Sequence, residues 1–176
     1  MAFRVAFAVN ETVARPQAVS ADAFRDTMRE LASGVALVTS ASEGKRAGCA
    51  VTSLTSLSLA PPSLLVCLNR DSSTLRAIRA SGVFAVSILG IGHEPLARRF
   101  SEPGLSGADR FAEGEWRKLH TGAPVLSDAL AAIDCRLDRI VEHATHAIVI
   151  GAAAALAKGG QAGLLLHWRS RFEAVT

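Results

Sequence analysis

Residues 50–68 read AVTSLTSLSLAPPSLLVCL, and the remaining segments can be placed relative to this stretch. Small hydroxyl residues alternate with apolar ones over Val51–Leu59, and this period of about two residues is typical of a strand with one buried face. The pair Pro61–Pro62 then removes two ladder donors and holds the backbone extended. The apolar run Leu64–Leu68 follows. The stretch therefore predicts a strand, a break at the prolines and a second strand that is buried.

A short helix is predicted directly after the second strand. The segment NRDSST at 69–74 is followed by LRAIRAS, and Gly82 supplies the stop. Ser72 or Ser73 can cap the helix, because a serine hydroxyl accepts from an orphan amide of the first turn. The same hydroxyls and amides could instead bind a phosphate, with several arginines close by in the sequence. The residues alone leave both interpretations open.

The other predicted elements are mostly strands. An amphipathic helix at 21–32 places Phe24, Met28 and Leu31 on one face. A second short helix is predicted at 93–100, and a glycine-rich loop at 101–121. Strands are predicted at 35–39, 83–89, 132–141, 148–150 and 163–168. Because the turn at 42–45 makes an antiparallel hairpin, this order favours a barrel over a doubly wound sheet.

Composition narrows the class of protein. The 176 residues are 49% hydrophobic, which suits one domain with a sizeable core and indicates an apolar surface buried in an oligomer. The formal charge of +3 comes from scattered lysines and arginines, so nucleic-acid binding is not indicated. No apolar run reaches the roughly 18 residues of a membrane-spanning helix, so no membrane role is expected.

The cysteines and the N-terminal residues both bear on the cellular compartment of the protein. Cys49, Cys67 and Cys135 are odd in number and widely spaced, which argues against a disulfide framework or a metal site. The interpretation is a cytoplasmic protein with buried thiols. Residues 1–20 contain a short apolar block interrupted by Asn10 and Glu11, so we expect an extension of the domain and no signal peptide.

The order and spacing of the segments resemble the flavin reductase family, the short-chain NAD(P)H:flavin oxidoreductases. The resemblance runs from about residue 22 to 172. The matching segments are 52–68, 69–74, 84–89, 96–100, 109–111, Trp116, 124–126 and 132–137. It implies a mainly β fold, an antiparallel, Greek-key-like FMN-binding split β-barrel with a few peripheral helices, spanning 21–176 after the extension at 1–20. It also implies a homodimer with the flavin site near the interface.

The resemblance further implies the reduction of FMN or FAD by NADH or NADPH, with the reduced flavin passed to a separate monooxygenase. Val51, Thr52 and Ser53 would contact the flavin ring, with Ser56 nearby. The ribityl chain and phosphate would be bound by Asn69, Ser72, Ser73 and Thr74, and further contacts would come from Arg98 or Phe100. The residues do not distinguish FMN from FAD, or NADH from NADPH.

His146 is the candidate catalytic residue, positioned by the resemblance against the nicotinamide. Family members carry Gly-Asp-His here, and this chain has Ala144–His146 with Thr145 in place of the acid. A second family acid is also absent, since Gly151 is followed by alanine. Glu142 is the nearby carboxylate that could substitute. By sequence alone, a solvated histidine at a strand start is the other interpretation.

Two alternatives accompany the reductase. The missing acids favour a non-catalytic flavin-binding or carrier protein, and the same fold could serve a flavin-dependent corrinoid reductase. A split-barrel oxidase acting on a pyridoxine-like substrate is a third possibility, which the pattern at 69–74 does not favour. Flavin binding without turnover would separate the carrier from the reductase.

Overall fold

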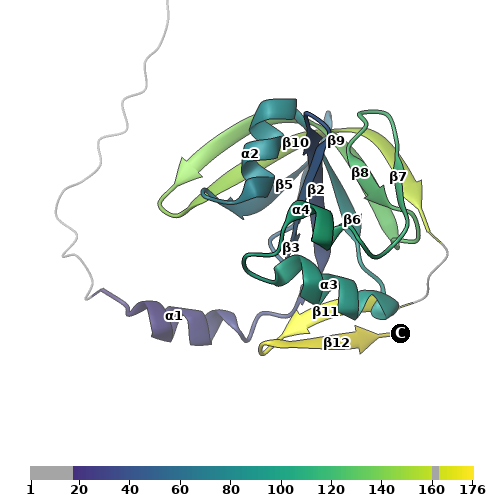
Figure 1. Cartoon of the computed structure of the whole chain (residues 1–176). Coiled ribbons are helices and arrows are strands. Elements are labelled where there is room, and N and C mark those ends of the chain that lie inside the picture. The colour runs from purple at the N-terminus through teal and green to yellow at the C-terminus, as the bar shows by residue number, and fades with distance from the viewer. Residues whose placement is uncertain (1–17, 160–162) are drawn as a thin grey trace, which may run out of the picture.

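A computed structural model describes residues 18–159 and 163–176. Most of the predicted extension at 1–20 lies outside the described residues. The architecture is mainly β, with antiparallel strands throughout the three sheets, as predicted. In Figure 1 the large sheet curls around α2, and α1 lies apart from it beside the β11–β12 hairpin.

The largest sheet has seven strands in the order β3-β2-β6-β9-β10-β5-β4. Its strands are β2 (Ala36–Ser42), β3 (Lys45–Val51), β4 (Thr55–Leu59), β5 (Pro62–Asn69), β6 (Val83–Ile88), β9 (Ala131–His143) and β10 (His146–Lys158). The two long strands β9 and β10 pair along most of their length, with two register shifts. These irregularities let the strands bend, so the sheet can close around a core.

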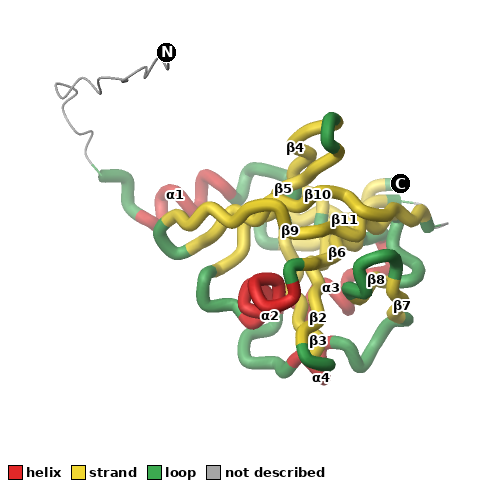
Figure 2. The backbone as a smooth tube through the Cα atoms, turned by 90° about the horizontal axis from the view of Figure 1, so that it is seen from above, coloured by secondary structure: helices red, strands yellow, loops and turns green. Residues whose placement is uncertain are grey.

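The smaller sheets and the helices cover the rim. One sheet comprises β1 (Ser33–Gly34), β11 (Leu164–Trp168) and β12 (Arg171–Val175), and the other comprises β7 (Trp116–Lys118) and β8 (Pro124–Leu126). The helices are α1 (Ala21–Met28), α2 (Ser73–Ser81), the 3-10 turn η1 (Ile91–His93), α3 (Glu94–Ser101) and α4 (Gly107–Arg110). Figure 2 shows α2 beside β2 and β3, and α4 near the ends of these two strands.

The core is divided by β2, which is buried on both faces. Ala36 and Val38 face the barrel interior with Leu75 and Ile78 of α2, while Leu37 packs in a second cluster with α3. Helix α2 also packs against β3, β5 and β6. It therefore fills the gap where the two ends of the curled sheet approach each other.

The stretch at 50–68 differs from its predicted shape at one point. The predicted strand 51–59 is interrupted, because β3 ends at Val51 and β4 starts at Thr55. The side chain of Ser53 explains the break: its Oγ accepts from the Cys67 amide at 3.0 Å and donates to the Cys67 carbonyl at 3.1 Å. A serine hydroxyl thus replaces a strand partner of β5, and residues 52–54 leave the ladder.

The predicted helix after the second strand is confirmed with its cap. Ser72 is the N-cap, since its Oγ accepts from the Leu75 amide at 3.1 Å. Gly82 ends the helix in the left-handed conformation at a φ of 69°, which glycine adopts without steric cost.

Three other sequence predictions are corrected. The predicted loop 101–121 contains α4 and β7, and the chain also forms the strand β12 after the last predicted strand. The helix predicted at 21–32 ends at Met28, so Leu31 lies after it, and Phe24, Met28 and Leu31 are all exposed. The short elements α4, β7 and β12 were not marked by a strong apolar period in the sequence.

Candidate functional site

The break between β3 and β4 forms one wall of a cavity of about 390 Å³, which we call the β3–β5 cavity. Its other walls are the end of β5, the N-terminus of α2 and the start of β10. Of the residues predicted from the sequence, those that line it are Val51, Thr52, Ser53, Asn69, Ser72 and His146. Segments that are distant along the chain meet in one hollow because β10 pairs with β5, with His146 opposite Asn69.

Free backbone donors line this cavity. Thr52 and Ser53 lie outside the strands and line the cavity, and within the described residues their amides donate no backbone hydrogen bond. The hydroxyl of Ser53 is already bonded to Cys67, so the contribution of residue 53 to a ligand would come from its amide. Unpaired amides beside an apolar Val51 suit a ring with one polar and one apolar end.

Two polar side chains near the N-terminus of α2, Asn69 and Ser72, can still donate hydrogen bonds to a ligand. The Asn69 Oδ1 accepts from the Asp71 amide at 2.8 Å, which turns the chain into the helix and leaves the Asn69 amide group able to donate. The Ser72 Oγ accepts from Leu75, so its proton remains available. A hydroxyl at the start of a nine-residue helix is a favourable partner for an anionic group.

His146 opens β10 at the edge of the cavity and is exposed. Its Nδ1 lies 2.9 Å from the Thr145 Oγ1, so the hydroxyl orients the ring and leaves Nε2 for another partner. Glu142 does not take the place of the missing acid, because its carboxylate pairs with Arg70 at 3.1 Å and with Arg79.

Two thiols that the sequence suggested as simply buried are half-buried and line the cavity, namely Cys49 and Cys67. Burial raises the pKa of the Cys49 thiol, although a hydrogen bond from Thr74 and the charge of Arg110 act in the opposite direction. The Cys49 thiol is therefore protonated at neutral pH, so it contributes a polarisable surface to the cavity and does not act as a nucleophile.

The other predicted site residues lie elsewhere. Thr74 is buried behind the cavity, and Ser73 lines a different hollow. Ser56 lies exposed on the edge strand β4. On α3, Phe100 packs in the core against Phe111, and Arg98 pairs with Glu94 and stacks on Phe172. The tertiary arrangement does not bring Ser56, Arg98 or Phe100 to the β3–β5 cavity.

Sequence reasoning missed part of the cavity wall. Cys49, Ala50, Cys67 and Leu68 line it, and all belong to the same strands as the predicted residues. His167, at the end of β11, lines two neighbouring hollows that share Thr52 with the β3–β5 cavity. No local motif marks His167, since it reaches Thr52 only through the pairing of β11 with β1.

Among the described residues, no helix is long and apolar enough to cross a membrane. The same residues contain no group of three or more His, Cys, Asp or Glu side chains able to hold a metal ion.

Known proteins resemble this chain in sequence and in fold. Residues 28–176 match the family model described as flavin reductase like domain. A relative from Methylorubrum extorquens, FMN reductase (NADH) RutF 2, is 47% identical over 152 residues, which cover 86% of this chain and 88% of the relative.

Solved structures share the fold. Nitrilotriacetate monooxygenase component B from Mycobacterium thermoresistibile is 31% identical with a TM-score of 0.80, over 88% of this chain and 86% of that one. The NADH:FAD oxidoreductase SgcE6 of Streptomyces globisporus, in complex with NAD and FAD fragments, is 28% identical with a TM-score of 0.80, over 88% and 92%. The predicted resemblance and fold class are thus confirmed.

Proposed function

The chain belongs to the family of flavin reductase like domains, and on that premise we propose that it is an NADH-dependent reductase of FMN. The observation that carries the proposal is the β3–β5 cavity, in which free amides, a capping serine and a histidine converge on one hollow. Its volume of about 390 Å³ fits the range of small-molecule sites, roughly 300–1,000 Å³.

A flavin supplies a ring that accepts hydride from a reduced nicotinamide and later releases the electrons. We assign the ring to the wall formed by Val51, Thr52 and Ser53, where the amides can donate to its polar edge. Asn69 and Ser72 bind the ribityl and phosphate groups at the start of α2. Ser73 and Thr74 act through the helix start, and Ser56, Arg98 and Phe100 have no assigned contact.

His146 is assigned to the nicotinamide. The bond to Thr145 orients the ring, and in the tautomer in which the Thr145 hydroxyl donates to Nδ1, Nε2 carries the proton and can donate to the carboxamide oxygen of the nicotinamide. Holding two planar groups in contact supplies much of the rate enhancement in such a reaction, because orientation replaces a chance encounter.

The choice of FMN and NADH rests on the relatives, several of which are named FMN reductase (NADH). Those names also favour catalysis over the carrier, corrinoid-reductase and oxidase alternatives. Since solved relatives include a component of nitrilotriacetate monooxygenase, we assign the reduced flavin to a separate monooxygenase. The three free cysteines support a reducing compartment such as the cytoplasm.

The exposed apolar face of α1 supports a homodimer. Phe24 of α1 is 61% exposed and Met28, one turn further along the helix, is also exposed, while Leu31, just after the helix, is 60% exposed. Large adjacent apolar side chains left open to water are typical of an interface. A second copy is the occupant that we assign to it. Phe24→Asp is expected to shift the protein from dimer to monomer in light-scattering measurements, and a wild-type protein that is already monomeric would refute this assignment.

The function is tested by anaerobic spectroscopy. The protein is mixed with FMN and then with NADH, and the loss of oxidised flavin absorbance is followed against a sample without protein. Rapid bleaching that depends on the protein is expected. Tight FMN binding with no bleaching by NADH or NADPH would overturn the reductase in favour of a flavin carrier.

A further inference from the structure

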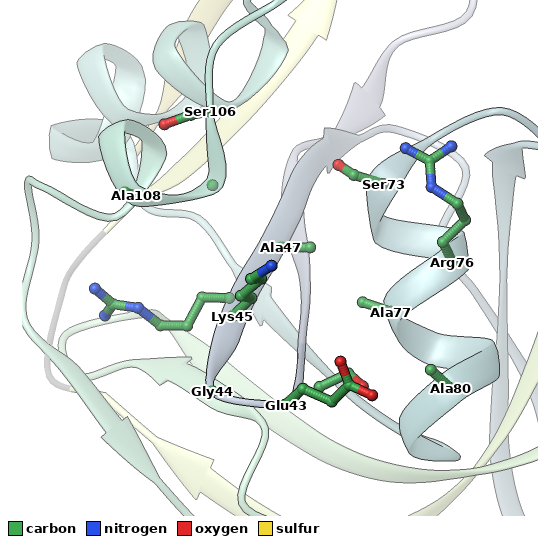
Figure 3. A pocket seen from close by; sticks show the side chains of 13 residues that line it. Glu43, Gly44, Lys45, Ala47, Ser73, Arg76, Ala77, Ala80, Ser106 and Ala108 are labelled. Carbon is green, nitrogen blue, oxygen red and sulfur yellow. The ribbon is translucent and has the colours of Figure 1, made fainter.

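A second cavity, of about 640 Å³, lies between the β2–β3 turn, α2 and α4 (Figure 3). We call it the basic cavity, and define it by Lys45, Arg46, Ser73, Arg76, Ala77 and Ser106. It is larger than the β3–β5 cavity, and the assignments above leave it without a role.

The shape of the basic cavity follows from small residues on the facing elements. Ser73, Ala77 and Ala80 occupy one side of α2, so this side of the helix lacks bulk. On the other side, a Cβ on Gly107 would lie 2.1 Å from the Arg46 carbonyl oxygen. Only glycine therefore lets α4 sit directly on β3 and enclose the hollow.

The charge of the cavity is uncompensated. The lining holds three cations, Lys45, Arg46 and Arg76, against one carboxylate, Glu43, so an excess of positive charge remains, and within the described residues none of the three cations makes an ion pair. The Arg76 guanidinium is held by the Asp71 carbonyl at 2.6 Å, and the Arg46 guanidinium lies 4.7 Å from the centre of the Phe111 ring. Figure 3 shows the Lys45 and Arg76 side chains on opposite walls. Three cations without acidic partners favour an anionic ligand.

The two cavities adjoin along shared elements. Ser72 lines the β3–β5 cavity, and its neighbour Ser73 lines the basic cavity. On β3, the segment 45–47 lines the basic cavity and the segment 49–51 lines the other. Two residues of a strand span only about 7 Å. A ligand bound with its ring in the β3–β5 cavity can thus reach the basic cavity past the start of α2.

We propose that the basic cavity binds the adenylate half of a dinucleotide whose reactive ring occupies the β3–β5 cavity. The phosphate would meet Lys45, Arg46 and the Ser73 hydroxyl, and the planar base would lie against the small residues of α2. NADH and FAD both carry an adenylate, whereas FMN does not. This inference rests on the proposed flavin reductase function.

The experiment compares each dinucleotide with its truncated form. Dissociation constants of FAD and FMN are measured by flavin fluorescence, and KM values are measured for NADH and for reduced nicotinamide mononucleotide, which lacks the adenylate. The variants are Lys45→Gln, which removes a charge, and Ala77→Leu, which fills the hollow. Lys118→Gln on β7 is the matched control, because it removes an exposed lysine elsewhere on the surface. AMP serves as a competing probe.

We expect Lys45→Gln to weaken one dinucleotide by about tenfold, the loss of a charge-assisted contact, with its truncated form unaffected. A higher KM for NADH alone assigns the site to the hydride donor, and a higher dissociation constant for FAD alone assigns it to the flavin. AMP should compete with that same dinucleotide.

The inference is overturned if wild type reduces FMN with NADH while both variants bind NADH and FAD as wild type does. It is also overturned if FMN and reduced nicotinamide mononucleotide weaken as much as the dinucleotides. The failure of the proposed function looks different: wild type then bleaches no flavin with any donor.

Discussion

His146 is held by a neutral neighbour. Among the described residues the only hydrogen bond of its imidazole is to the Thr145 hydroxyl, and the carboxylate of Glu142 is paired with two arginines. A hydroxyl can orient an imidazole without adding a negative charge beside it. Thr145 therefore orients the imidazole without adding a charge, as the proposed contact between His146 and the nicotinamide requires.

The His146→Ala variant is expected to slow flavin reduction by about tenfold or more, with flavin affinity changed less than about twofold. The reason is that the imidazole is assigned to the nicotinamide and not to the flavin. Stopped-flow reduction and flavin titration measure the two effects separately. His120→Ala, an exposed histidine beside Arg136, is the control. Equal reduction rates in wild type and His146→Ala would remove His146 from the mechanism.

Gly151 is fixed by packing against Phe84. A Cβ at this position would lie 2.4 Å from the Phe84 Cζ and 3.0 Å from the Cys135 Cβ, all inside the barrel. Gly151→Ala is therefore expected to lower the free energy of unfolding by about 1–3 kcal/mol, as overpacked cores do. Urea denaturation measures it. Gly34→Ala, with open space around the added methyl group, should change stability far less; similar losses in both would contradict the packing argument.

At the scale of elements, α2 has two functions at once. Leu75 and Ile78 fill the barrel interior, while its first turn presents Ser72 to one cavity and Ser73 to the other. A helix that is part of the core holds its N-terminus rigidly, so the donors at its start are preorganised for an anion. Helix α1 has no such anchorage, since none of its side chains is buried.

This difference between the helices predicts unequal effects of losing their caps. Ser72→Ala removes the cap of α2 and should cost about 1 kcal/mol of global stability. Ser20→Ala removes the equivalent bond of α1, to the Ala23 amide at 3.2 Å, but α1 can fray without exposing the core. Thermal unfolding of both variants is the measurement. Equal losses of stability would mean that α1 unfolds together with the barrel.

At the scale of the whole molecule, the barrel closes over a core that includes an ionisable group. Cys135 is fully buried on β9. Burial, and then the neighbouring charge of Asp134, raise its pKa from 9.0 to about 12. The folded state thus keeps this proton where the unfolded chain loses it. The contribution is complete below about pH 9 and is lost as the pH rises toward 12.

Wild type is therefore expected to lose stability between pH 9 and pH 11, more than the Cys135→Ala variant does over the same range. The variant starts from a lower stability because it leaves a small cavity. Urea denaturation at several pH values gives both slopes. Parallel pH profiles would show that another group governs the alkaline loss.

The sequence by itself determined the local features. Ser72 and Gly82 mark the ends of α2 through cap chemistry, and the alternation around residues 50–68 marks strands, because these signals act over a few neighbouring residues. The cavity residues Val51, Thr52, Asn69 and Ser72 were predictable in the same way, since they lie at the ends of those segments once the family resemblance gives them a role.

Only the tertiary structure decided which of these residues meet. The pairing of β10 with β5 brings His146 to Asn69, and the Ser53–Cys67 bonds break the predicted strand and free the amides beside it. Phe100 lies in the core, and Arg98 pairs with Glu94 and stacks on Phe172, because α3 packs against β2, which no period in the sequence specifies. Contacts between distant segments depend on sheet order and register, and these are properties of the closed barrel.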